Sequence, residues 1–496
     1  MINILLAITV GKIIETILEC LLALLIIIMV INTFRIKKTA INNKKDIVEL
    51  DNKKLKNHLI KAIQIPTISP ISLEEDTTAF DKFEKFLEES YPLVHKYCEK
   101  TVINTHALLF KVSASEKTEL LPIGFLAHQD VVPAEPKGWD YPPFSGEVVI
   151  EDGVEYIYGR GAIDMKVHLL ATMEAVEHLI SVGHKFNRDV YLCFGFDEEL
   201  SGRLGAFQIV NYLKEKNITL EFIVDEGGVV LDGSMLGIDG KVALIGNSEK
   251  GYADFTLTAT KDGGHSSSPI HPTSIEVLAK GITKLEKHRF PTRWTPSTIE
   301  LFEELTPFMK PGYKFVCANR KIFSPILKYV LCKVNPAVAA ILRTTLSPTI
   351  MSGSAGFNII GREACVNINC RMLPGDTKDS VLKYIQKIVG KDIEVTWQPI
   401  TCYDPPSKIS SAHTDSFQTI AKAISLSFDK LVPAPFPFIA GSDAKFYYPV
   451  AKNVYRFSPY PISEEDTTRI HSANERMATA NLAPAVNFFI NLIKIS

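Results

Sequence analysis

The sequence predicts an α/β protein built on a mixed, mostly parallel sheet between helices. Three apolar runs predict central strands, at residues 120–127, 189–196 and 220–224. Continuous apolar runs of this length are typical of parallel strands that are covered on both faces. Because open α/β sheets bind ligands beyond the carboxyl ends of their strands, the polar residues that follow each run are candidates for a functional site.

The composition is that of a globular protein with more than one domain. The chain has 496 residues, which is too long for a single hydrophobic core. A net charge of −2 gives no indication of nucleic-acid binding. The eight cysteines form no CxxC pair, so a thiolate zinc site is not expected.

The N-terminal segment is not globular. Residues 13–34 are apolar enough to span a bilayer despite Glu15 and Glu19, and we expect a single membrane anchor. The alternative is a secretory signal peptide, although no clear cleavage site follows. The basic residues after the span favour a cytosolic body, whereas the glycosylation sequon at Asn217 favours the opposite side, and both orientations stay open.

Histidine and acidic residues follow the predicted strands. His128 and Asp130 are one residue apart on an extended chain, so their side chains point the same way, as in a metal-binding imidazole with an orienting carboxylate. The acids 197–199 and Asp225 end the next two runs, and Asp164 precedes a predicted helix. Each group alone fits a strand end or a helix cap. Together they predict a divalent metal site, because adjacent acids repel one another unless a cation lies nearby.

A different pattern occupies residues 251–397. Two alternating segments and two amphipathic helices predict an antiparallel sheet that is covered on one face. These segments are residues 252–260, 273–288, 364–371 and 378–389. Residues 290–345 are proline-rich and are interpreted as an insertion, with an apolar helix near 315–342 that is either core or the wall of a channel for an apolar substrate.

Five stretches, in this order, resemble the zinc-dependent carboxypeptidase/aminoacylase family of metallopeptidases. The resemblance covers residues 50–496 and is closest to the carboxypeptidase S and N-fatty-acyl-amino-acid synthase/hydrolase members. The stretches are His128-Gln129-Asp130-Val131-Val132-Pro133, Gly159-Arg160-Gly161-Ala162-Ile163-Asp164-Met165-Lys166, Phe196-Asp197-Glu198-Glu199, Gly264-His265-Ser266-Ser267 and Ile470-His471-Ser472-Ala473-Asn474-Glu475.

The resemblance implies two zinc ions. One ion would bind His128 and Asp225, the other would bind His471 and Glu199, and Asp164 would bridge them. The chemistry agrees, because a bridging carboxylate lets two dications lie close enough to share one water.

The resemblance also implies catalytic and substrate-binding residues. Glu198 would be the general base, Asp130 would orient the His128 ring, and His265 would stabilise the oxyanion. The residues implied in substrate binding are Asn358, Arg371 and Gly441, the first two on a free carboxylate. Arginine suits that role because its guanidinium grips a carboxylate with two hydrogen bonds.

The chain departs from the family pattern at two positions. Gly361 stands where relatives often have proline, which leaves the shape of that loop open. Met165 follows Asp164, where many relatives have an acidic residue joined by a cis peptide bond, and we predict a cis bond here as well.

The expected organisation combines these parts. It comprises an anchor and stalk (1–40), a catalytic domain in two parts (41–246 and 399–496), and an inserted α+β lid domain of the dimerisation type (247–398) with the helical insertion at about 290–345. By resemblance, the body would lie on the lumenal or extracellular side. His265 would act either within one chain or across a homodimer formed through the lid.

The expected activity is hydrolysis of an N-acyl amino acid, possibly a fatty-acyl one and in a reversible reaction. One alternative is a carboxypeptidase that acts on short peptides. Another, of a different class, is a catalytically silent protein that binds acyl amino acids.

Overall fold

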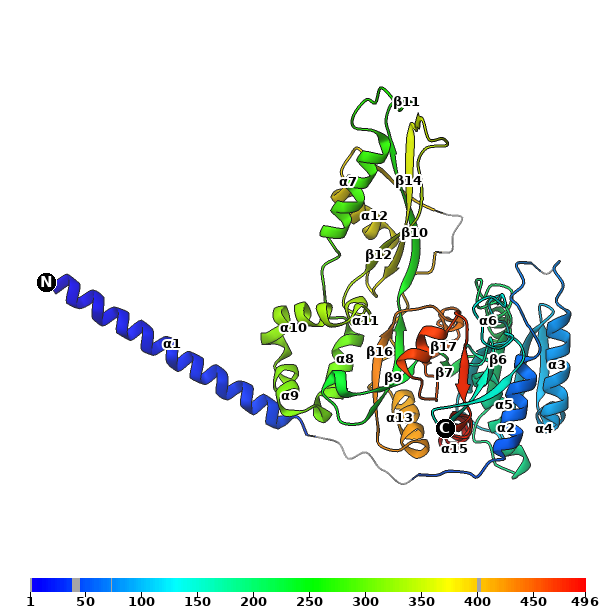
Figure 1. Cartoon of the computed structure of the whole chain (residues 1–496). Helices are drawn as coiled ribbons and strands as arrows, with labels where there is room; N and C mark the ends of the chain where they lie inside the picture. The colour runs from blue at the N-terminus through cyan, green and yellow to red at the C-terminus, as the bar shows by residue number, and fades with distance from the viewer. Residues whose placement is uncertain (1, 38–44, 73, 399–402) are drawn as a thin grey trace.

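A nine-stranded mixed sheet forms the centre of the larger part of the molecule. The computed structural model describes residues 2–37, 45–72, 74–398 and 403–496 (Figure 1). The strand order is β1-β2-β6-β3-β7-β17-β9-β16, and β8 pairs with β9. The strands are β1 (Glu99–Ile103), β2 (Ala107–Val112), β3 (Ile123–His128), β6 (Val190–Gly195), β7 (Leu220–Asp225), β8 (Val229–Asp232), β9 (Lys241–Glu249), β16 (Leu431–Phe438) and β17 (Ala451–Arg456). Because β3 runs parallel to β6 and β7, and β17 parallel to β7, the predicted mixed, mostly parallel sheet is confirmed.

Helices cover both faces of this sheet. Phe125 and Ala127 of β3 pack on one side, among α2, α5, α13 and α15, whereas Leu126 packs on the other side with α6. This alternation explains why β3 reads as a continuous apolar run. The helices of this part are α2 (Asn52–Ile63), α3 (Thr78–Ser90), α4 (Pro92–Tyr97), α5 (Lys166–Ser181), α6 (Ala206–Glu215), α13 (Asp415–Ser427), α14 (Glu464–Arg469) and α15 (Leu482–Ile495), with short 3₁₀ turns η1 (Ser234–Leu236), η3 (Asp443–Phe446) and η4 (Thr479–Asn481).

A second, antiparallel sheet belongs to a smaller unit, here called the small unit. Its order is β12 (Thr345–Ser352), β14 (Glu363–Met372), β10 (Gly251–Thr260) and β15 (Glu394–Trp397). Helices α7 (Ser274–Lys287) and α12 (Lys378–Val389) pack on it. The far end of the unit carries the short pair β11 (Gly264–His265) and β13 (Ile359–Ile360) (Figure 1). A three-stranded sheet of β4 (Glu147–Glu151), β5 (Val154–Tyr158) and β18 (Arg476–Ala478) lies in the larger part.

The insertion is a series of short helices. The expectation of one apolar helix near 315–342 is wrong, because the segment breaks after Ala318 and Val334. The second break precedes Pro336, which starts a new helix, as proline at a first helical position does. The helices are α8 (Pro296–Leu305), η2 (Thr306–Phe308), α9 (Pro311–Ala318), α10 (Arg320–Val334) and α11 (Pro336–Ala340). Helix α8 packs on β16, so this part of the insertion is core of the larger unit.

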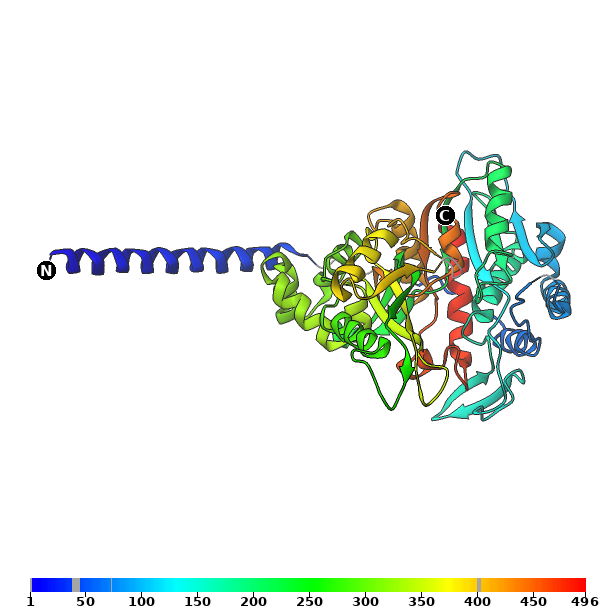
Figure 2. The same ribbon diagram turned by 90° about the horizontal axis from the view of Figure 1, so that it is seen from above.

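Helix α1 (Ile2–Arg35) projects from the body (Figures 1 and 2). Within the described ranges it is the helix long and apolar enough to cross a membrane, over Gly11–Arg35 with a mean hydropathy of 2.7. A signal sequence shares these properties. The C-terminal end of α1 contacts α9.

A buried ion pair joins the ends of two neighbouring strands of the large sheet. Arg456 at the end of β17 contacts Glu249 at the end of β9, with 2.5 Å between Nη2 and Oε2, and neither side chain is more than 5% exposed. The Arg456 Nε also donates to Ser442 Oγ at 3.0 Å. The pair therefore fixes the turn after β16 against the two strands.

Removing one partner of this pair should destabilise the protein strongly. Glu249→Ala should lower the free energy of unfolding by about 3–5 kcal/mol, because the Arg456 charge stays buried and unpaired. Lys452→Ala, which breaks the exposed pair with Glu221, is the control and should cost about 0–1 kcal/mol. Urea unfolding of the full chain in detergent measures both, and equal losses would contradict this account.

Candidate metal centre

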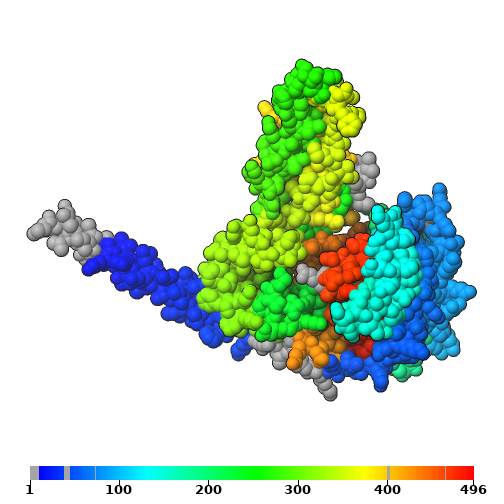
Figure 3. All heavy atoms as spheres, viewed as in Figure 1, coloured from blue at the N-terminus to red at the C-terminus, as the bar shows by residue number. Residues whose placement is uncertain are grey.

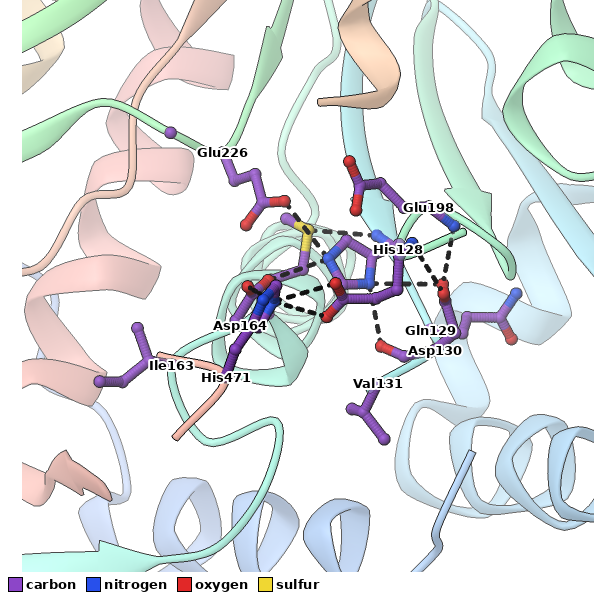
Figure 4. Close-up of polar contacts among 12 residues, drawn as sticks. His128, Gln129, Asp130, Val131, Ile163, Asp164, Glu198, Glu226 and His471 are labelled. Atoms are coloured by element: carbon purple, nitrogen blue, oxygen red, sulfur yellow. Dashed lines mark hydrogen bonds and ion pairs between the residues drawn. The ribbon is translucent and has the colours of Figure 1, made fainter. Parts of the chain in front are cut away.

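The candidate site lies at the carboxyl ends of the parallel strands. His128 ends β3, Glu198 and Glu199 follow β6, and Glu226 follows β7. Asp164 precedes α5, and His471 comes from the loop between α14 and β18. These side chains converge in one place, although His471 follows Asp164 by 307 residues (Figure 4).

Asp164 stands between the two imidazoles. Its Oδ1 lies 3.0 Å from His128 Nε2, and its Oδ2 lies 3.1 Å from His471 Nε2. Each imidazole faces a second carboxylate, Glu226 at 3.3 Å from His128 and Glu199 at 2.9 Å from His471. Two groups of possible ligands therefore share Asp164, and within each group the ligand atoms lie within 4.8 Å of one another.

Glu226, and not Asp225, lies beside His128. The Asp225 carboxylate accepts hydrogen bonds from the backbone N–H groups of Ala444, at 2.8 Å, and Glu226, at 2.9 Å. Successive side chains at a strand end point in opposite directions, so only one of the two acids can face the site. The choice of Asp225 in the sequence analysis is therefore corrected to Glu226.

The site contains more carboxyl groups than imidazoles. Burial raises the pKa of the Glu226 carboxyl to about 8 and that of Glu198 well above its usual range. The hydrogen bonds that His471 donates to the carboxylates of Asp164 and Glu199 raise the pKa of His471 to about 10. If all four carboxyl groups ionise, their charge exceeds that of two imidazolium groups, and a nearby cation would relieve the repulsion. A donor set of imidazole nitrogens and carboxylate oxygens fits divalent cations such as zinc.

Asp130 lies behind His128 and contacts several parts of the site. The His128 Nδ1 is 2.9 Å from the backbone oxygen of Asp130 and 3.4 Å from its Oδ1. The Asp130 carboxylate also accepts from the backbone N–H groups of Glu198, at 3.3 Å, and Glu199, at 3.2 Å, and from Ser69 Oγ at 2.6 Å. It can therefore orient the His128 ring and the turn that carries both glutamates.

Glu198 is separate from both ligand groups. In Figure 4 the dashed lines at Glu198 leave its backbone nitrogen, toward Asp130, and not its carboxylate. Among the described residues, the two groups that could hold a metal do not include it. Its carboxylate is therefore not needed as a ligand in either group.

Glu475 accepts a hydrogen bond from the backbone of Asp164, and no role was predicted for it from the sequence. This fully buried side chain accepts from the backbone N–H groups of Ile163, at 2.8 Å, and Asp164, at 3.1 Å, and pairs with Arg160 at 2.6 Å. Its place in the same stretch as His471 was the signal that could have found it. The Asp164–Met165 peptide bond is cis, which confirms that prediction.

The substrate-binding candidates do not gather at the metal residues. His265 is exposed on β11 at the far tip of the small unit, where the Ser266 N–H donates to the Asn358 oxygen at 3.0 Å (Figure 1). Arg371 lies at the other end of that sheet, with its guanidinium 4.7 Å from the centre of the Tyr252 ring. Gly441 lies in the turn after β16, next to Glu249.

Several named proteins are similar to this chain. The N-fatty-acyl-amino acid synthase/hydrolase PM20D1 of Xenopus tropicalis is 35% identical over 485 residues, which cover 96% of this chain and 93% of that protein. The probable carboxypeptidase S-like 2 of Dictyostelium discoideum is 34% identical, with 97% and 94% covered. Among solved structures, an M20 family metallo-carboxypeptidase from Sulfolobus solfataricus superposes with a TM-score of 0.62 at 19% identity, with 90% of this chain and 99% of that chain covered.

A family model assigns the chain directly. The model for peptidase family M20/M25/M40 matches residues 124–495, which is well over half of the sequence and includes every candidate metal ligand. The chain therefore belongs to peptidase family M20/M25/M40, a family of metal-dependent hydrolases.

Proposed function

We propose that the protein is a di-zinc amidohydrolase that releases an amino acid from an N-acyl amino acid. The observation that carries this proposal is the Asp164 carboxylate, which stands between two imidazole–carboxylate groups while Glu198 stays apart from both. This arrangement provides two places for ions, one shared ligand and one free base, as hydrolysis at a pair of metal ions requires.

The residues of each group have distinct tasks. His128 and Glu226 would hold one ion, His471 and Glu199 the other, and Asp164 both. Zinc ions bound there would polarise the amide carbonyl and lower the pKa of a shared water. Glu198 would take a proton from the attacking water and pass it to the leaving amine, and burial raises the pKa of its carboxyl, which favours holding the proton between these two steps.

The small unit would bind the rest of the substrate. Arg371 and Asn358 are proposed to hold the free carboxylate, and His265 to stabilise the oxyanion, with Gly441 in the turn beside the substrate. Arg371 pairs with Tyr252 at one end of β10, and Thr260 lies at the other end of this strand, toward the tip. The eight extended residues between these two ends span roughly 25 Å. One copy of this rigid sheet cannot bring both ends to one small substrate, so we propose that the tip residues act from a second copy.

The acyl group is proposed to be a fatty acyl chain. The relative with 35% identity bears the name N-fatty-acyl-amino acid synthase/hydrolase, and four further relatives of that name are 32–34% identical. The carboxypeptidase S-like relatives support cleavage of a C-terminal peptide bond as the second candidate, because that amide also leads to an amino acid with a free carboxylate.

Helix α1 is proposed to stay attached as a membrane anchor. The Asn319 side chain of the insertion donates to the Met29 oxygen at 3.1 Å and accepts from the Asn32 side chain at 3.1 Å. The Lys314 Nζ donates to the Ile36 oxygen at 2.8 Å. These contacts give the end of α1 a fitted place on the folded body, which a discarded signal sequence would not need.

Glu198→Gln should abolish most hydrolysis without loss of metal. A carboxamide cannot accept the proton, so the rate should fall by about 10²–10⁴-fold. Released amino acid is measured by mass spectrometry, and bound zinc by elemental analysis. Glu215→Gln, at an exposed position at the end of α6, is the control. Activity near that of the unchanged protein would remove Glu198 from the mechanism.

The variants Glu226→Gln and Asp225→Asn should show which of the two neighbouring acids binds zinc. The first variant should bind one of two zinc ions at least tenfold more weakly, because a ligand is lost. The second should retain both ions, because the Asp225 carboxylate contacts backbone N–H groups. Zinc titration of the apo protein measures both, and the reverse pattern would restore Asp225 as the ligand.

The substrate class is tested with two compounds. The full chain in detergent, supplied with zinc, is incubated with an N-oleoyl amino acid or with an N-blocked dipeptide. We expect faster release of the amino acid from the oleoyl compound, because of the fatty-acyl relatives. Preference for the dipeptide would make the protein a carboxypeptidase. No release from either compound, with zinc bound, would favour a silent binding protein.

A further inference from the structure

Helix α10 has two apolar faces. On the inner face, Leu331 packs against the core cluster around α8, and the Trp294 Nε1 donates to Ser324 Oγ at 2.8 Å. The outer face is also apolar and is exposed to solvent. Its members are Ile322, Ile326, Tyr329, Val330 and Val334, at 44%, 67%, 67%, 47% and 59% exposure.

The exposed residues form one continuous stripe. Their spacings of four, three, one and four residues place them on the same side of a helix. A single exposed apolar residue needs no explanation, but a contiguous apolar stripe of this kind marks a surface that contacts another apolar phase or partner. Within the described part of the chain, no other element covers this stripe.

The place of the stripe indicates a lipid bilayer as that partner. Helix α10 begins at Arg320, directly after Asn319, whose side chain contacts Met29, Asn32 and Thr33 of α1. In α1 these residues end the apolar run, so they mark the level at which the helix would leave the hydrocarbon. In Figure 3 the surface of the insertion lies directly beside the end of α1.

The charges of the insertion agree with this placement. Residues 310–334 contain six basic residues and no acidic one. Lys321 and Lys333 are exposed at the two ends of the stripe. Lysine side chains beside an apolar helix face reach the head groups while the face enters the acyl boundary, which is the pattern of helices that lie in the membrane interface.

We propose that α10 lies in the membrane interface, with the stripe Ile322, Ile326, Tyr329, Val330 and Val334 against the lipid. The body would then have two attachments, the spanning helix α1 and the interfacial helix α10. This inference does not depend on the hydrolase activity, because no residue of the metal centre takes part in it.

Photo-crosslinking of the full chain tests the proposal. Benzoylphenylalanine replaces Tyr329 in one variant and Tyr97 in a matched control, since both tyrosines are exposed, at 67% and 60%, and Tyr97 lies at the end of α4 in the larger part. Each variant is reconstituted into phosphatidylcholine/phosphatidylserine vesicles and irradiated. Peptides from the protein that floats with the vesicles are analysed by mass spectrometry.

The expected result is a lipid adduct at position 329 in several-fold excess over position 97. Equal adduct yields at the two positions would overturn the proposal. A cross-link from position 329 to a second copy of the chain, without lipid, would also overturn it and would make the stripe an interface between copies. If the variant at 329 does not fold, position 326 takes its place with the same control and the same outcomes.

Discussion

The negative charge gathered around Asp164 is the constraint on which the rest of the structure depends. Its two oxygens face imidazoles from opposite ends of the chain, at positions 128 and 471, so both halves of the larger part must fold together before the site exists. The small unit is inserted between these halves with little disturbance of their packing, because the chain leaves the larger part and returns to it at one point. At this point Tyr252 and Asp404 exchange backbone hydrogen bonds of 2.8 and 3.1 Å.

The sequence predicted the features that depend on local pattern. The central strands were found because β3, β6 and β7 are buried on both faces, and His128, Asp164, Glu199 and His471 were found by their stretches and converge as expected. Features that depend on the assembled sheet were missed. Asp225 and Glu226 are adjacent acids, and only the direction of the strand end decides which one faces His128. Glu475 contacts the backbone of Asp164 across 311 residues, and its place in the same stretch as His471 was its one signal in the sequence.

The insertion shows a different limit of sequence analysis. Its apolar residues occur on both sides of α10, and periodicity alone cannot tell a helix between two protein layers from a helix between protein and lipid. The two alternatives raised by the sequence, core or the wall of a channel, each describe one face only. The contact with α1 is what favours lipid at the outer face, and that contact joins residues separated by about 290 positions.

The same insertion sets the orientation of the catalytic edge. Helix α8 packs on β16, and β16 leads into the turn whose Ser442 and Ala444 contact Glu249 and Asp225. Helix α9, which follows α8 in the insertion, contacts α1. A body joined to α1 by a stalk alone could rotate freely, whereas packing on both sides of the insertion limits that rotation. If α1 anchors the protein as proposed, the candidate metal centre keeps one direction relative to α1, and an amphiphilic substrate that partitions into the bilayer would meet the site from a constant side.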